Sequence, residues 1–217
     1  MPSAAGPPFD PELDAVLTAL AANVPPSITP AMIDRFRSIP PDPTVGGLVT
    51  QVGAVHDQRT ISGFADADID VSVFHPAQPG RAGPGILYLH GGGMIFGNRF
   101  GGVGAYLPFV ASHGAVVVAV EYRLAPEHPD PIPLEDCFAA LAWAVANARD
   151  LGIDPDRLIV AGQSAGAGLA AGVALLARDR GGPAIAAQLL VSPMLDDRND
   201  TTSARQIDGV GVWDRTS

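Results

Sequence analysis

The hydrophobic positions of this chain change pattern near residue 54. Before it, residues 10–24 and 29–38 carry apolar residues at helical spacing, and each segment opens with Asp-Pro or Thr-Pro. That opening is typical of an N-cap followed by proline at the first helical position. Two short amphipathic helices cannot bury their apolar faces alone, so we expect residues 1–50 to form a helical cap on a main body of residues 51–217, with a frayed leader as the alternative.

After residue 54 the pattern predicts strands alternating with helices. Residues 55–63 and 69–76 alternate apolar and polar positions, as half-exposed antiparallel strands do. Near-continuous apolar runs, typical of strands buried on both faces, cover residues 85–91, 115–122, 157–162 and 186–193. Helical spacing covers residues 103–112, 133–149 and 165–180. The chain is therefore predicted to have an α/β fold, with a mostly parallel central sheet and helices on both faces.

Composition narrows the possible partners and the location. The formal charge is −10 and all 13 basic residues are arginine, so a basic surface for nucleic acid is not expected. No apolar stretch reaches the length of a membrane span, and no basic leader precedes an apolar segment. We expect a cytoplasmic protein of undetermined oligomeric state. The single cysteine, Cys137, lies in an apolar helical pattern and is expected to be a buried core thiol.

A run of glycines follows the strand predicted at residues 85–91. His90 is followed by Gly91, Gly92 and Gly93, so three N–H groups are unshielded by side chains and free to approach a negatively charged oxygen. This arrangement predicts an oxyanion hole, and a flexible glycine turn is the alternative. The apolar residues 94–96 that come next either line an acyl or alcohol pocket or simply pack.

The motif Gly162-Gln163-Ser164-Ala165-Gly166 joins a predicted buried strand to a helix of small residues. This context favours a sharp turn that exposes the Ser164 hydroxyl, with Gly162 and Gly166 allowing close backbone approach. The N–H of Ala165 and the helix dipole would favour a developing oxyanion.

The amino-acid composition argues against two other interpretations of these glycines. Gly162, Gly166 and Gly168 also fit the dinucleotide turn of short-chain dehydrogenases, but that chemistry needs a lysine and the chain has none. The same absence excludes a Walker-type phosphate loop. Cysteine and histidine spacing gives no metal site, and no cofactor is expected.

A third predicted strand-to-helix turn, residues 120–137, is rich in proline and charge. Glu121, Tyr122, Arg123 and Glu127 either form a buried polar network or fix the path of the chain. We favour the second interpretation, in which the proline-rich segment fixes the path of the chain into the next helix.

The three turns together resemble the hormone-sensitive-lipase-like (bacterial family IV) carboxylesterases of the α/β-hydrolase superfamily, over roughly residues 10–217. The resemblance implies hydrolysis of small esters with short to medium acyl chains. It implies that Ser164 is the nucleophile, that Gly91, Gly92 and Ala165 hold the oxyanion, and that the N-terminal helices form the cap. Gln163 departs from the family, which often has aspartate there.

The resemblance also implies a catalytic acid and a histidine after Ser164, in that order. All five histidines, however, precede Ser164: His56, His75, His90, His113 and His128. The carboxylates that follow, Asp196, Asp197, Asp200, Asp208 and Asp214, come too soon to match the family's acid, and none is assigned. We therefore expect a C-terminally truncated esterase lacking the last strands, which leaves residues 185–193 as an open sheet edge. A non-catalytic ligand-binding module and an inactive remnant are the alternatives.

Overall fold

The computed structural model describes residues 6–21, 24–78 and 80–217. It divides into two compact units. The larger unit spans residues 39–195, and the smaller one combines residues 1–38 with residues 196–217.

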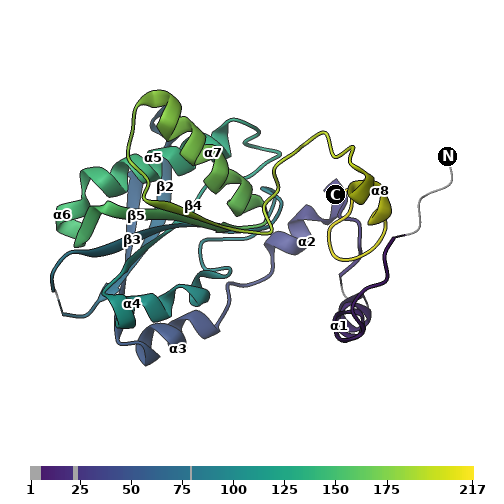
Figure 1. The fold of residues 1–217 in the computed structure, drawn as a ribbon, viewed down its shortest axis with the longest axis horizontal. Helices are drawn as coiled ribbons and strands as arrows, with labels where there is room; N and C mark the ends of the chain where they lie inside the picture. Colours follow the sequence, from purple (N-terminus) through teal and green to yellow (C-terminus); the bar gives the residue numbers. More distant parts are fainter. Residues whose placement is uncertain (1–5, 22–23, 79) are drawn as a thin grey trace. The chain divides into compact units, whose positions relative to one another are not determined.

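The larger unit is built on a six-stranded sheet in the order β1-β2-β4-β3-β5-β6 (Figure 1). The strands are β1 (Ala54–Ser62), β2 (Asp68–Pro76), β3 (Gly83–Leu89), β4 (Val116–Glu121), β5 (Ile153–Gln163) and β6 (Ala187–Val191). The first two pair antiparallel and β2 joins β4 antiparallel, whereas β4, β3, β5 and β6 run parallel. The carboxyl ends of the parallel strands therefore meet along one edge, where ligands of open α/β sheets bind.

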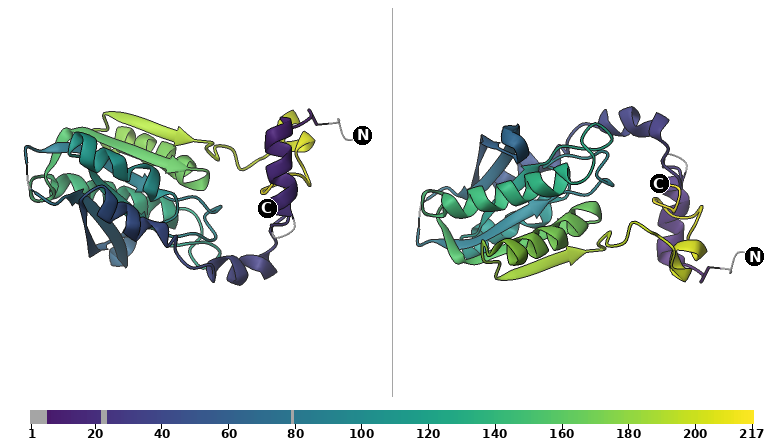
Figure 2. Two further views of the ribbon diagram at one scale, coloured as in Figure 1. Left: turned by 90° about the horizontal axis from the view of Figure 1, so that it is seen from below. Right: turned by 90° about the horizontal axis from the view of Figure 1, so that it is seen from above.

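Helices cover both faces of this sheet (Figures 1 and 2). One face carries α5 (Ile132–Ala146), α6 (Ala148–Leu151) and α7 (Ala165–Arg180), and the other carries α3 (Thr44–Gln51), η3 (Val103–Ala105) and α4 (Leu107–His113). A one-turn helix, η2 (Phe64–Asp66), joins β1 to β2. Valine, leucine and isoleucine side chains fill both layers, because each central strand has apolar residues on both of its faces.

The smaller unit contains α1 (Pro11–Ala21), η1 (Pro30–Met32), α2 (Ile33–Arg37) and α8 (Thr202–Gln206). Its buried carboxylate is Asp214, 4% exposed, which accepts hydrogen bonds from the Ser27 hydroxyl, the Gly209 N–H and the Ser217 N–H. Asp214 thus joins the two sequence-distant halves of this unit. The N-terminal helix was expected over residues 10–24, of which 22 and 23 lie outside the described residues.

The α/β fold with a mostly parallel sheet and helices on both faces is confirmed. The prediction that residues 186–193 are buried on both faces is wrong, because four of the five residues of β6 are exposed to solvent. In the described part of the chain, β6 also has a hydrogen-bonded neighbour on one side only. The helix expected over 133–149 is two helices that meet at Asn147. Cys137 is buried, as expected.

The boundary between the compact units falls after Ser38, whereas the expected domain boundary lay at residue 50. Helix α3 accounts for the difference: its Val45 is 5% exposed and belongs to the core of the larger unit. The pattern analysis missed this helix. The role of residues 1–50 as a cap stays a prediction.

Candidate active site

Ser164 lies at the sharp turn between the end of β5 and the start of α7. Its backbone angles are φ 55° and ψ −118°, a conformation that residues other than glycine rarely adopt. Such strain persists only where the surroundings impose it, and it is concentrated at functional sites. The turn lies at the carboxyl edge of the parallel strands, where the sequence placed it.

The two glycines of the motif are required by close backbone contacts. A Cβ on Gly166 would lie 2.1 Å from the Leu89 carbonyl oxygen, and one on Gly162 would lie 2.3 Å from the Gly166 carbonyl oxygen. No real Cβ tolerates such contacts, so any side chain there would push α7 away from the end of β3. The absence of side chains at these positions brings Ser164 against the loop that follows β3.

Backbone hydrogen bonds hold the strained turn in place. The Ser164 N–H donates to the Val191 carbonyl oxygen over 2.9 Å, and the Ser164 carbonyl oxygen accepts from Gly168 N–H at 3.1 Å and from Met194 N–H at 3.2 Å. The segment after β6 therefore contributes to the geometry of the turn. The motif alone does not reveal this contribution.

The glycine-rich loop after β3 lies beside Ser164. A Cβ on Gly91 would be 3.5 Å from the Ser164 Cβ, so the Gly91 backbone is in contact range of that side chain. Gly92 has φ 115° and would clash with the Phe96 carbonyl if it carried a Cβ. Gly93 also has a positive φ, 62°. No acceptor for the N–H of Gly91, Gly92 or Ala165 is found among the residues that the structure describes.

His90 is buried and supports this loop. Its Nδ1–H donates to the Gly91 carbonyl oxygen over 2.7 Å, and its ring stacks on Tyr122 at 4.2 Å between centroids. The Tyr122 hydroxyl in turn donates to the His90 carbonyl oxygen over 2.7 Å. Burial lowers the pKa of His90 to about 4, which keeps the imidazole neutral at ordinary pH. Its Nε2 has no hydrogen-bond partner in the described residues.

The turn after β4 reaches the same loop through polar side chains, which is the polar network that the sequence analysis gave as the less favoured alternative. Glu121 accepts from the Arg99 guanidinium over 2.8 Å and from the Arg99 N–H over 3.1 Å. Arg99 also donates to the buried Ser72 hydroxyl over 2.8 Å. Two consecutive residues, Glu121 and Tyr122, therefore fix both ends of the loop that contains the glycines. The sequence reasoning did not identify Arg99.

Asp136 is a second residue that the sequence reasoning missed. It is fully buried on α5 and accepts two hydrogen bonds from the Arg123 guanidinium, at 2.7 and 2.8 Å, and one from the Phe64 N–H at 2.9 Å. Helical spacing places Asp136 on the same face as Ala140 and Ala144, both buried. A carboxylate in the apolar stripe of a helix was the available signal.

No histidine or carboxylate is hydrogen-bonded to Ser164 in residues 6–21, 24–78 and 80–217. Among the later carboxylates, Asp196 pairs with Arg198 at 2.8 Å and Asp214 is used within the smaller unit. Sequence reasoning assigned neither to catalysis. The described residues also contain no group of three or more metal-ligating side chains and no helix that could cross a membrane.

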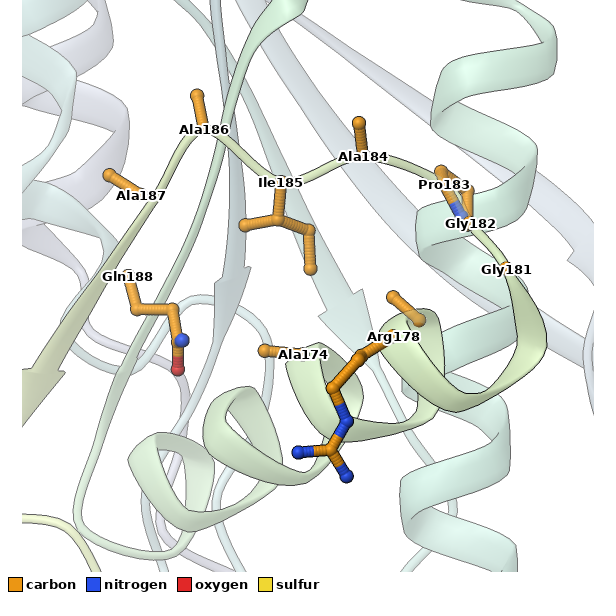
Figure 3. Close-up of a pocket in the computed structure, with 11 residues that line it drawn as sticks. Ala174, Arg178, Gly181, Gly182, Pro183, Ala184, Ile185, Ala186, Ala187 and Gln188 are labelled. Carbon is orange, nitrogen blue, oxygen red and sulfur yellow. The ribbon is translucent and has the colours of Figure 1, made fainter.

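A cavity of about 580 Å³ lies at the far end of α7 (Figure 3). It is lined by residues of α7 from Ala174 onward, by the loop that follows the helix and by the start of β6. Ala174 is ten residues along the helix from Ser164, or about 15 Å at the helical rise. This cavity is therefore remote from the strained turn.

The comparisons with known proteins identify the family of this fold. A family model described as the alpha/beta hydrolase fold matches residues 86–215. The chain belongs to the α/β-hydrolase family. Within it, the chain is 43% identical to carboxylesterase NlhH of Mycobacterium tuberculosis over 141 residues, which are 63% of this chain and 43% of NlhH. It is 45% identical to esterase LipI of the same species over 119 residues, or 54% of this chain and 37% of LipI.

Solved esterase structures extend the similarity over nearly the whole chain. A bacterial heroin esterase matches with a TM-score of 0.78 and 34% identity, covering 96% of this chain and 65% of that one. Esterase LipW from Mycobacterium marinum matches with a TM-score of 0.77 and 34% identity, covering 95% of this chain and 64% of that one. This α/β-hydrolase thus spans less than half the length of the curated relatives named above and about two thirds of these structures.

Proposed function

We propose that this α/β-hydrolase provides the nucleophile and the oxyanion hole of a carboxylesterase that acts on small esters. Ser164 Oγ attacks the ester carbonyl carbon, and the N–H groups of Gly91, Gly92 and Ala165 stabilise the resulting oxyanion. The observation that carries the proposal is the strained backbone of Ser164 directly beside Gly91. The names of the relatives, a carboxylesterase and esterases, support the reaction class.

Among the residues that the structure describes, no histidine or carboxylate is hydrogen-bonded to Ser164 as a general base. The neutral His90 imidazole donates its one proton to Gly91 and stacks on Tyr122, so its role in the proposal is to hold the loop. A serine hydroxyl without a base is a weak nucleophile, and loss of triad members lowers kcat by several orders of magnitude. We therefore propose that the acid and histidine of the triad are missing from this chain and that efficient turnover requires them.

Chemical rescue tests the proposal directly. The purified chain is incubated with an alkyl fluorophosphonate, and the phosphonylated protein is followed by intact mass, with and without added imidazole as an external base. We expect slow, single-site labelling at Ser164 that imidazole accelerates, and no labelling of Ser164→Ala. Ser112→Ala, which alters an exposed serine on α4, is the matched control and should label like the wild type.

Labelling that is equal in the wild type and Ser164→Ala would overturn the proposal. A second candidate follows from the missing base: the same site could bind a small ester without turning it over. Saturable ester binding that survives Ser164→Ala, together with no imidazole-dependent labelling, would establish this second function in place of the first.

A further inference from the structure

Arg99 lies at the far end of the loop that begins at His90 and contains the glycines, and its side chain is 11% exposed. Its guanidinium donates from Nη1 to Glu121 Oε2 over 2.8 Å and from Nε to the Ser72 hydroxyl oxygen over 2.8 Å. The Arg99 backbone N–H donates to the same Glu121 oxygen over 3.1 Å. The backbone and the side chain of this one residue are therefore both fixed to the sheet, through Ser72 on β2 and Glu121 at the end of β4.

The anchor of Arg99 on β2 is itself held by a histidine. Ser72 is fully buried, and its Oγ lies 2.9 Å from Nε2 of His56 on β1. Because Ser72 Oγ accepts from Arg99, its own hydrogen is free to be donated to His56. Burial and the Arg99 charge lower the pKa of His56, which favours the neutral imidazole that accepts this hydrogen. The position of Arg99 is thus tied to three strands, β1, β2 and β4.

Gly97 connects Arg99 to the glycines of the proposed oxyanion hole. Gly97 has φ 93°, and a Cβ on it would lie 2.5 Å from the Gly91 carbonyl oxygen and 2.9 Å from His90 Nδ1. The bare Cα of Gly97 therefore packs directly against the Gly91 carbonyl group. Since Gly97 is two residues before Arg99 in the chain, a displacement of Arg99 disturbs this contact.

The orientation of the peptide group between Gly91 and Gly92 decides where the Gly92 N–H points. In a trans peptide the C=O and the N–H point in opposite directions. The Gly91 carbonyl oxygen accepts from His90 Nδ1–H over 2.7 Å, so the Gly92 N–H points away from the His90 ring. Contacts on the carbonyl side of this peptide thus determine the direction of the hydrogen-bond donor on its other side.

We propose that Arg99 is a positioning residue of the oxyanion hole, which holds the Gly91–Gly92 peptide in the orientation that presents the Gly92 N–H to the oxyanion. The inference rests on the proposed function of Ser164 and adds a residue that acts without touching the substrate. Consecutive glycines impose little restriction on their own φ and ψ angles. The orientation of their peptides therefore depends on contacts from outside the glycine run, and Arg99 supplies them through Glu121 and Gly97.

The rate of fluorophosphonate labelling at Ser164, measured with imidazole present, tests this role. Arg99→Ala should lower the limiting rate about 10- to 100-fold and leave the half-saturating concentration nearly unchanged, because a donor to the oxyanion is misplaced. Arg99→Lys keeps a cation beside Glu121 and should recover part of the rate. Guanidinium chloride at a low, non-denaturing concentration should also restore part of the rate of Arg99→Ala.

Arg180→Ala is the matched control at the end of α7 remote from Ser164. Arg180 donates to both carboxylate oxygens of Glu135, at 2.6 and 2.8 Å. Its guanidinium carbon lies 4.7 Å from the centre of the Phe138 ring, and that of Arg99 lies 4.8 Å from the centre of the Phe100 ring. The control therefore removes a similar set of contacts, and it should label at the wild-type rate with no effect of guanidinium.

The ³¹P resonance of the phosphonylated serine is a readout that a loss of stability alone does not move. The phosphoryl oxygen of the adduct takes the place of the oxyanion, and its hydrogen bonds affect the chemical shift of phosphorus. The resonance of Arg99→Ala should move towards that of the urea-unfolded adduct, whereas Arg180→Ala should keep the wild-type shift. If Arg99→Ala does not fold, Glu121→Gln weakens the same anchor and should change the rate and the resonance in the same directions.

Hydrogen–deuterium exchange of the unlabelled protein distinguishes failure of this proposal from failure of the proposed function. The N–H groups of Ile95 and Phe96 both donate to the Gly92 carbonyl oxygen at 3.0 Å, and they should exchange faster in Arg99→Ala than in Arg180→Ala. Faster exchange without labelling of the wild type at Ser164 would refute the nucleophile and leave the anchoring by Arg99 standing. Unchanged exchange in Arg99→Ala, or a wild-type labelling rate with a wild-type ³¹P shift, would overturn the role of Arg99.

Discussion

The central strands and β6 have similar apolar sequences but different surroundings. Ala119, Tyr88 and Ala161 follow one another across β4, β3 and β5, and the next residue in this row is Leu189 of β6. The first three are at most 1% exposed, whereas Leu189 is 47% exposed. Hydrophobicity of a strand therefore predicts that it joins the sheet, but its burial depends on neighbours that the local pattern does not specify.

The largest difference in stability is expected between substitutions of two carboxylates, one buried in the core and one exposed at the end of α7. Asp136→Ala removes the buried partner of Arg123, whose guanidinium then keeps only its hydrogen bond to the Phe64 carbonyl oxygen. We expect the free energy of unfolding to fall by about 3–5 kcal/mol, measured by urea denaturation. Asp179→Ala, which breaks the exposed pair with Arg178 at the end of α7 nearest β6, should leave the urea midpoint unchanged. Equal losses would show that Asp136 does not stabilise the core.

Leucine-to-alanine substitutions test the same difference between the buried centre of the sheet and its exposed edge, and they do not change the charge of the protein. Leu87 on β3 is fully buried, and Leu87→Ala should lower the free energy of unfolding by about 2–5 kcal/mol because it leaves a cavity. Leu189→Ala on β6 should cost less than about 1 kcal/mol, since half of the side chain is already in water. Similar urea midpoints for the two variants would contradict the difference between centre and edge.

The stability of the protein is expected to depend on pH because His90 is buried in the larger unit. The folded-state pKa of His90 is about 4, below the ordinary 6.5, so the unfolded chain binds more protons at intermediate pH. Stability is therefore full above pH 6.5 and falls as pH drops towards 4, by about 2 kcal/mol between pH 7 and pH 5. Burial and the Arg99 charge also lower the pKa of His56, which adds to this loss.

The variant His90→Asn isolates the contribution of His90. Urea midpoints measured from pH 7 to pH 5 should decline less steeply in this variant than in the wild type. His113→Asn, at an exposed histidine of α4, should keep the wild-type slope. An unchanged slope in His90→Asn would show that this imidazole is not buried in its neutral form.

The same contrast explains what the sequence could predict. The strand pattern and the G-x-S-x-G motif located the sheet and the turn at Ser164, because both depend on neighbours close in sequence. The contacts of Arg99 with Glu121 and of Asp136 with Arg123 join residues 13 to 22 positions apart, and no local period marks such pairs. The sequence pattern did not predict helix α3, because its two central glycines lower its helical propensity. Packing against the rest of the larger unit stabilises this helix.

The smallest stability effect, and the most informative about the edge, is expected from Leu189→Lys. The outer edge of β6 has no neighbouring strand in the described residues, and such an edge presents free N–H and C=O groups that can pair with another copy. A lysine on an edge strand discourages this association. We expect this variant to unfold at nearly the wild-type urea concentration but to form fewer oligomers by size-exclusion chromatography with light scattering. Leu175→Lys is the matched control: Leu175 is 51% exposed on α7, so it removes a similar apolar surface away from the strand. If both variants reduced association equally, general hydrophobicity rather than the β6 edge would drive it, whereas an effect confined to Leu189→Lys would assign association to backbone pairing along β6.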